Sequence, residues 1–325
     1  MQPLTHRTVD LRDITMSITE QGDGEPIVLC HGFPGLGFSW RHQMSALAEA
    51  GYRVIAPDMR GYGGTDAPSD SRLYDRTHTV ADLVGLLDTL GLDRAVFGGH
   101  DFGAHLTWDL PTLAPDRVRA LIQFSVPRLP RSPIRPSAGF AHMAAKHFIH
   151  FHYFQTPGVA DAELDANPDE FLAKIFHALG GAGDYLSCWQ HPSEGNGYLD
   201  VLPAAPPLPW SWLSAEEFDR YVDEFARTGF TGGLNWYRAE DLVWEQTVDT
   251  HDLPITVPTA FIAGAQDPVL TMMGRAALAT MADLVPGLRS TLVVPGAGHF
   301  VQMEAPATVN DAITGFLRDL ESPTP

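Results

Sequence analysis

The sequence predicts an α/β protein with a mostly parallel β-sheet, helices on both faces of the sheet and a mainly helical insertion. Short apolar runs, typical of strands buried on both faces, alternate with amphipathic helical patterns. This alternation stops between residues 127 and 251, a Pro-rich stretch that holds five of the seven tryptophans. We therefore expect a core formed by residues 1–127 and 251–325, and a cap formed by residues 128–250.

The elements expected for the core follow from the period of the apolar residues. Alternating polar and apolar residues between Val9 and Thr19 predict two short strands, and a polar turn at 21–24 leads into a buried strand at 26–30. Further buried strands are expected at 53–56, 95–98, 120–124, 259–263 and 291–294, and helices at 40–50, 79–90, 104–113 and 272–284. In such a sheet ligands bind beyond the carboxyl ends of the strands, so functional residues are expected there.

The charge of the chain narrows the choice of partners. A net charge of −19, from 21 Lys and Arg against 40 Asp and Glu, repels phosphate backbones and anionic lipid surfaces. We therefore expect no nucleic acid and no membrane as partner, and a neutral small molecule as ligand. The amino-terminal residues lack the apolar core of a signal peptide, and no apolar run approaches eighteen residues, so we expect a cytoplasmic protein.

Neither the cysteines nor the clustered histidines predict a metal site. Cys30 and Cys188 are far apart in apolar or aromatic surroundings, and we expect two buried thiols rather than a disulfide. His147, His150 and His152 form a histidine-rich stretch, but on a helix only the first two are neighbours, and no carboxylate or thiolate lies near them in sequence. No metal and no organic cofactor is expected.

Asp101 is the candidate nucleophile. It follows the strand at 95–98 and precedes a helix, with Gly99 and Gly103 two positions away on either side. Small residues at these positions suit a tight strand-to-helix turn that pushes one side chain into a cleft. The pattern resembles the nucleophile elbow of esterases with aspartate in place of serine, although Asp before a helix is also a common N-cap.

A second motif follows the strand that ends at Cys30. The His-Gly-Phe-Pro sequence at 31–34 resembles the oxyanion-hole loop of α/β hydrolases, although Gly and Pro alone suit an ordinary tight turn. In the functional interpretation the backbone N–H groups of Phe33 and Phe102 point at a developing oxyanion.

Two further residues complete a catalytic order. Asp267 lies just past the strand at 259–263, and His299 follows the last strand and precedes the closing helix. Either one alone is a plausible turn or capping residue. A nucleophile, an acid and a histidine in this order, each past its own strand, is the triad arrangement of the α/β-hydrolase fold.

Over nearly its whole length the chain resembles the soluble epoxide hydrolases of bacterial type in the α/β-hydrolase superfamily. Two cap segments, 152–158 and 233–238, are similar to the family segments that carry the catalytic tyrosines, which implies Tyr153 and Tyr237. Considered without its motif, each of these two tyrosines is more typical of an aromatic core residue. Aromatic residues are also expected to line an apolar pocket, with three candidates: Trp40, Trp236 and Phe300.

The resemblance implies a two-step reaction on a small-molecule epoxide. Asp101 opens the ring to an alkyl-enzyme ester while the tyrosines polarise the epoxide oxygen, and water activated by His299 then releases a vicinal diol. Asp267 orients His299. Family members often have Glu after the His-Gly-Phe-Pro motif, whereas this chain has Gly35, so the way the water is held stays open. The sequence also leaves open whether the chain forms a homodimer.

Two other functions remain as alternatives. Haloalkane and haloacid dehalogenases share the aspartate nucleophile, but they typically place Trp or Arg after it, where this chain has Phe102, which has no side-chain N–H. Many haloalkane dehalogenases also take their acid from after the sixth strand, and no Asp or Glu occurs between Arg117 and Ala160. A non-catalytic ligand-binding protein on the same fold needs a pocket but not the full set of reactive groups.

Overall fold

A computed structural model describes residues 4–274 and 276–321. Its strands form one sheet in the order β1-β2-β4-β3-β5-β6-β7-β8, antiparallel where β1, β2 and β4 pair and parallel elsewhere. The strands are β1 (Thr5–Asp10), β2 (Thr15–Gln21), β3 (Glu25–Cys30), β4 (Tyr52–Pro57), β5 (Ala95–His100), β6 (Val118–Phe124), β7 (Thr259–Gly264) and β8 (Leu288–Val294). The predicted fold class, a mostly parallel sheet in an α/β protein, is confirmed.

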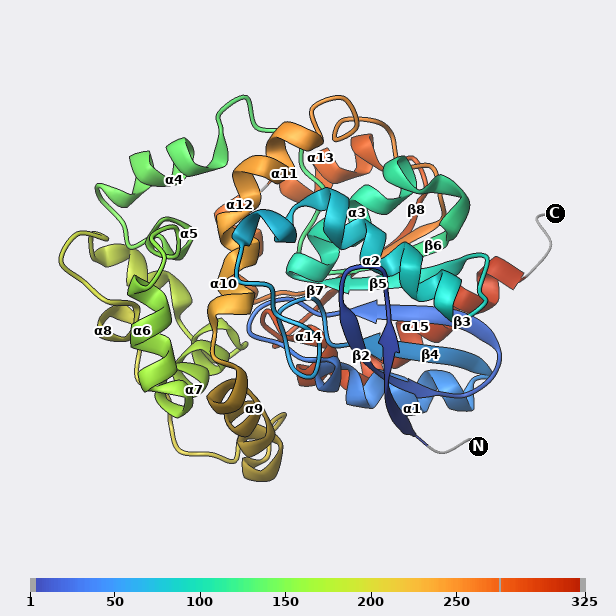
Figure 1. The fold of residues 1–325 in the computed structure, drawn as a ribbon, viewed down its shortest axis with the longest axis horizontal. Coiled ribbons are helices and arrows are strands. Elements are labelled where there is room, and N and C mark those ends of the chain that lie inside the picture. Colours follow the sequence, from blue (N-terminus) through green and yellow to red (C-terminus); the bar gives the residue numbers. More distant parts are fainter. Residues whose placement is uncertain (1–3, 275, 322–325) are drawn as a thin grey trace.

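Helices cover both faces of the sheet (Figure 1). Val28 and Cys30 of β3 belong to one apolar cluster, which contains buried residues of α2 (Arg76–Thr89) and α3 (Phe102–Leu113). Ile27 and Leu29 belong to the other, with residues of α1 (Arg41–Glu49) and α15 (Pro306–Glu321). Successive side chains of a strand point to opposite faces, so a continuous apolar run is the pattern that a strand between two helical layers requires.

The chain between β6 and β7 forms helices that gather on the side of the molecule away from both termini (Figure 1). They fall within residues 128–250, the range predicted for the cap. The helices are α4 (Pro136–Ala144), α5 (His150–Tyr153), α6 (Val159–Ala166), α7 (Pro168–Leu179), α8 (Tyr198–Val201), α9 (Ala215–Thr228), α10 (Thr231–Arg238) and α11 (Glu240–Gln246).

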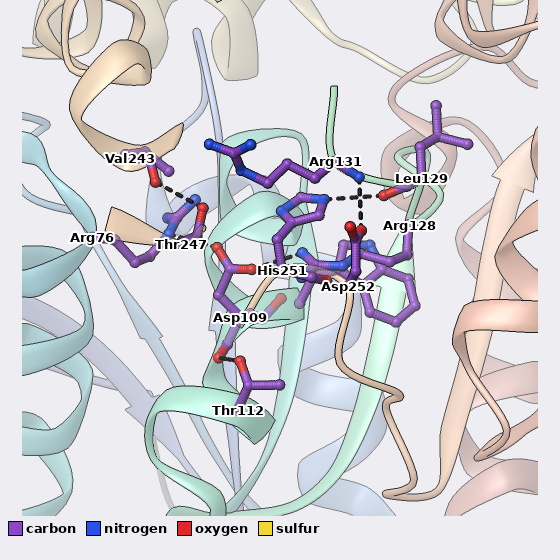
Figure 2. A network of polar contacts seen from close by, with 12 residues as sticks. Arg76, Asp109, Thr112, Arg128, Leu129, Arg131, Val243, Thr247, His251 and Asp252 are labelled. Carbon is purple, nitrogen blue, oxygen red and sulfur yellow. Dashed lines mark hydrogen bonds and ion pairs between the residues drawn. The ribbon is translucent and has the colours of Figure 1, made fainter. Parts of the chain in front are cut away.

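A buried polar network lies where the chain enters and leaves this helical segment (Figure 2). Asp109 of α3 accepts a hydrogen bond from Arg128 at 2.7 Å and forms an ion pair with Arg76 at 2.7 Å. Arg128 also donates to the carbonyl oxygen of His251, and Nε2 of His251 donates to that of Leu129. The two connections are thereby joined to each other and to α3.

The prediction of one continuous helix at 272–284 is wrong. The chain forms α12 (Pro268–Met273) and α13 (Ala277–Leu284), followed after β8 by α14 (Val301–Glu304). Gly274 interrupts the pattern with φ of +91°, a left-handed conformation that ends a right-handed helix.

Two other expectations concern the whole chain. Cys30 and Cys188 are buried free thiols, as predicted. Among the described residues, no helix combines the length and the apolar character that crossing a membrane would require.

Candidate active site

Asp101 occupies the sharp turn between β5 and α3, with φ of 55° and ψ of −120°. This conformation is strained for a residue with a side chain. The turn is possible because its flanks lack side chains: a Cβ on Gly99 would lie 2.2 Å from Oγ1 of Thr107, and a Cβ on Gly103 would lie 2.1 Å from the carbonyl oxygen of Cys30. The two glycines therefore hold Asp101 at the cavity wall.

The loop after β3 lies directly against the Asp101 carboxylate. The backbone N–H of Phe33 donates to its Oδ1 at 2.9 Å. A Cβ on Gly32 would lie 2.3 Å from the same Oδ1 and 2.6 Å from the backbone nitrogen of Phe102. Because Gly32 has no side chain, this loop approaches both the Asp101 carboxylate and the backbone nitrogen of Phe102.

His299 connects Asp101 to Asp267. Nε2 of His299 lies 3.5 Å from Oδ2 of Asp101, and its Nδ1 lies 3.2 Å from both carboxylate oxygens of Asp267. The backbone is also held, since the carbonyl oxygen of His299 accepts hydrogen bonds from Nε2 of His100 and Oγ of Ser125. The parallel strands β5, β7 and β8 thus bring together three residues that are far apart in sequence.

The charges of these groups depend on one another. Burial alone would raise the pKa of Asp101, but the hydrogen bond and charge of His299 hold that pKa well below its usual range. Burial likewise opposes protonation of His299, yet the carboxylates of Asp267 and Asp101 raise its pKa to about 10. At neutral pH Asp101 is therefore an anion and His299 a cation.

Asp101 and His299 open onto a cavity of about 350 Å³. Much of its wall is apolar and includes Val126, Phe140, Phe151, Ile175, Leu179 and Met272. The polar groups in the wall include Tyr237 of α10. A cavity of this kind suits a neutral, largely apolar ligand that is orientated by a small number of polar contacts.

Comparison with known proteins agrees with this geometry. Residues 25–142 match the α/β hydrolase fold family. The chain is 45% identical to epoxide hydrolase A of Mycobacterium tuberculosis, over 98% of each protein. The crystal structure of epoxide hydrolase A from Mycobacterium thermoresistibile has a TM-score of 0.90 at 46% identity, covering 97% of this chain and 98% of that one. The chain belongs to the epoxide hydrolases. A Streptomyces epoxide hydrolase matches at a TM-score of 0.93 and 37% identity, covering 98% of this chain and 96% of that one.

In this epoxide hydrolase Tyr237 lines the cavity beside Asp101 and His299. Its ring packs edge-on against Phe102 at 4.6 Å and against Phe33 at 5.5 Å. Burial, and then the charge of Asp101, raise the pKa of Tyr237 well above its usual value. The phenol therefore stays protonated at neutral pH and is available as a hydrogen-bond donor.

The structure contradicts the placement of Tyr153 in the site. Its hydroxyl donates to Oε2 of Glu163 at 2.9 Å, and its ring lies beside a shallow outer pocket that His152 and Thr156 also line. The hydrogen bond to Glu163 of α6 thus holds the Tyr153 phenol outside the cavity. His150, one helical turn earlier on α5, lines the cavity instead.

The prediction that Trp40, Trp236 and Phe300 line the pocket is also wrong, because each of these side chains faces another part of the molecule. Trp40 packs against Phe124 in the cluster on the α1 side of the sheet. The indole N–H of Trp236 donates to the carbonyl oxygen of Arg60 at 2.9 Å, and Phe300 packs edge-on against a phenylalanine of α7. They belong to the packed interior, where large aromatic side chains are equally common.

Several polar residues of the cavity wall were not predicted. His105 lies one helical turn after Asp101 on α3, a spacing that could have identified it. Glu240 follows Tyr237 by three residues, but α10 ends between them, so helical spacing gives no such signal. Tyr185 begins a short 3₁₀ helix of the cap, Tyr185–Gln190, and nothing in the sequence marks it as a cavity residue.

Glu240 leads to a prediction about stability. Burial, followed by smaller effects of neighbouring charges, raises its pKa from 4.5 to about 7. The folded state therefore holds this proton more tightly than the unfolded state, so the contribution to stability is complete below pH 4.5 and is lost as pH rises through 7. Relative to Glu240→Gln, which cannot titrate, the wild type should lose at most about 3 kcal/mol of unfolding free energy over this range.

Urea denaturation at about pH 4.5 and about pH 8 measures this difference. Glu49→Gln is the control, since Glu49 is exposed at the end of α1 and its substitution should give the same stability difference at both pH values. An equally constant difference for Glu240→Gln would contradict the assignment of a shifted pKa to Glu240.

Proposed function

We propose that this epoxide hydrolase converts a neutral, largely apolar epoxide to a vicinal diol through a covalent ester on Asp101. One observation carries the proposal. The Asp101 carboxylate, 2.9 Å from the Phe33 amide nitrogen and 3.5 Å from the His299 imidazole, lines an apolar cavity that also contains Tyr237.

In the first step an oxygen of Asp101 forms a bond to one ring carbon while the bond from that carbon to the epoxide oxygen breaks. The epoxide oxygen keeps the electron pair and takes a proton from Tyr237, which becomes a phenolate. Donation by a positioned acid lowers the barrier because charge develops on this oxygen as the ring opens.

In the second step the loss of the Asp101 charge removes one of the two carboxylates that raise the pKa of His299. The imidazolium gives its proton to the Tyr237 phenolate, and the neutral imidazole then takes a proton from water and directs the oxygen to the ester carbonyl carbon. The N–H groups of Phe33 and Phe102 hold the oxyanion, and its collapse breaks the bond to the alkoxide, which takes the proton from His299 and leaves as the diol. The Asp101 carboxyl proton passes to His299, which restores the resting charges.

Asp267 and Gly35 have different places in this scheme. Asp267 is buried and contacts Nδ1 of His299, which leaves Nε2 facing Asp101 and the water. Gly35 offers no side chain to bind water, so the proposal assigns that task to His299 and the two amide groups.

The rival dehalogenase reaction fits the site less well. A departing halide needs N–H donors, and the Phe102 side chain supplies none. An epoxide oxygen needs a proton donor, and the cavity provides the Tyr237 phenol. A function limited to binding gives no reason for three aligned ionisable groups at the wall of an apolar cavity.

The source of the new diol oxygen tests this mechanism. In a single turnover, with enzyme in excess over an aryl epoxide in heavy-oxygen water, the diol should carry no label, because its new oxygen comes from Asp101. Enzyme first cycled in heavy-oxygen water and then moved to ordinary water should give labelled diol, which is the control. Mass spectrometry of the diol measures both, and label in the diol of the first experiment would exclude the ester mechanism.

A further inference from the structure

His150 occupies the part of the cavity wall where the family segment led us to expect a phenol. It lines the same cavity as Asp101 and Tyr237. Its ring lies 5.7 Å from the Tyr237 ring, centre to centre, at an interplanar angle of 83°. The other two histidines of this segment are elsewhere, because His147 donates to the carbonyl oxygen of Trp189 and His152 borders the outer pocket.

Tyr185 contacts one of the two ring nitrogens of His150. The Tyr185 hydroxyl oxygen lies 2.6 Å from Nδ1 of His150. This separation is typical of an O–H donor and shorter than the usual N–H donor range of about 2.7–3.2 Å. The same hydroxyl lies 3.0 Å from that of Tyr198, which is placed to donate in turn. We assign the Tyr185 hydroxyl as the donor to Nδ1, which places the proton of a neutral His150 on Nε2.

The charge of His150 agrees with this arrangement. Burial is the main cause that lowers the pKa of His150 to about 4, and the opposing effect of the Asp101 charge is smaller. The imidazole is therefore neutral at neutral pH. With Nδ1 occupied by the Tyr185 hydroxyl, its one N–H is on Nε2.

We propose that Nε2–H of His150 is the second hydrogen-bond donor to the epoxide oxygen, beside the Tyr237 phenol, and that Tyr185 positions it by fixing its tautomer. This inference rests on the proposed function. The bonds that form and break are those of the ring-opening step. Tyr237 transfers the proton, because a phenol is a far stronger acid than a neutral imidazole, and His150 keeps its proton while it stabilises the developing oxyanion.

Ring opening can be measured separately from ester hydrolysis in the His299→Gln background, where the ester accumulates. We would mix this variant with excess styrene oxide, quench at intervals and follow the ester on Asp101 by intact-mass spectrometry. Adding His150→Phe should slow ester formation roughly tenfold to a hundredfold. His150→Gln, which keeps an N–H donor, should recover part of the rate.

Tyr153→Phe is the matched control in the same background. It removes a phenol from the same helix, but that phenol binds Glu163 outside the cavity. The rate of ester formation should stay within about twofold of the parent. Thermal unfolding of each variant shows whether it is folded, and His150→Gln provides a second measure should His150→Phe be unstable.

The role of Tyr185 needs a measurement that a purely structural residue would not affect. Tyr185→Phe should slow ester formation when His150 is present and add nothing when His150 is already Phe, because it acts through the imidazole. Nitrogen NMR of the labelled enzyme should show His150 with a bare Nδ1 and a protonated Nε2. The opposite tautomer, or equal slowing by Tyr185→Phe in both backgrounds, would overturn this role.

The outcomes separate the inference from the mechanism on which it rests. Ester formation on Asp101 in the parent, with an unchanged rate after both His150→Phe and His150→Gln, would overturn the role of His150 and leave Asp101 as the nucleophile. Absence of any ester in the parent would overturn both.

Discussion

His299→Gln should become heavier by one substrate molecule when it is mixed with an epoxide. Asp101 still attacks the ring, but glutamine cannot take a proton from water, so the ester persists. Steady-state turnover should fall roughly 10²- to 10⁴-fold, the usual loss when a general base is removed. Intact-mass spectrometry measures the adduct, and peptide mapping should locate it on the peptide that contains Asp101.

Two variants serve as controls for this experiment. Adding Asp101→Ala should prevent the adduct, whereas His191→Gln, at an exposed position in the cap, should turn over normally and accumulate nothing. Normal turnover by His299→Gln, or an adduct on a residue other than Asp101, would show that the roles of Asp101 and His299 are wrongly assigned.

Tyr237→Phe should slow ring opening roughly 10²- to 10³-fold, the range observed when one donor to a developing oxyanion is removed. The ring stays in place, so the change removes the proton donor without creating a cavity. Hydrolysis of an ester that has already formed should change little, because His299 and the amide groups carry that step. Rapid-quench mass spectrometry of Tyr237→Phe, in enzyme that retains His299, gives the rates of ester formation and ester hydrolysis separately.

Tyr52→Phe is the control for Tyr237→Phe. The Tyr52 hydroxyl donates to Glu321 at the end of α15, away from the cavity residues, and its loss should leave both rates unchanged. Adding His150→Phe to Tyr237→Phe should nearly abolish ester formation. If Tyr237→Phe forms the ester as fast as the wild type, another group must protonate the epoxide oxygen.

The strands and the carboxyl edge of the sheet could be predicted because the responsible pattern is local. A continuous apolar run followed by Gly or a polar residue identifies a buried strand and its end, and parallel strands place all such ends at one edge. Asp101, Asp267 and His299 were therefore identifiable, although they come from distant segments. Their contacts in the structure follow from this shared edge.

The side of α5 that faces the cavity could not be predicted. The helix has four residues, His150 to Tyr153, and all four are aromatic or imidazole side chains, so no apolar face distinguishes one direction. The orientation is decided by partners distant in sequence, since Glu163 binds Tyr153 and Tyr185 binds His150. The motif thus predicted a segment that reaches the cavity, but the side chain that lines the cavity is His150 and not Tyr153.

The errors about the pocket and the helix at 272–284 have other causes. Burial of an aromatic residue is predictable, but whether it faces a cavity or packs in the interior depends on its neighbours in space, as Trp40 and Phe300 illustrate. A glycine is tolerated within many helices, so the left-handed conformation of Gly274 is not apparent from its presence alone.

The network around Asp109 has a consequence for how substrate and diol are exchanged. It holds both ends of the cap segment against α3, the helix that starts directly after the nucleophile (Figure 2). A rigid displacement of the cap that moved Arg128 away from α3 would separate its buried ion pair with Asp109, and breaking one buried pair costs about 3–5 kcal/mol. We therefore expect substrate and diol to exchange through smaller movements of cap segments that lie farther from Asp109.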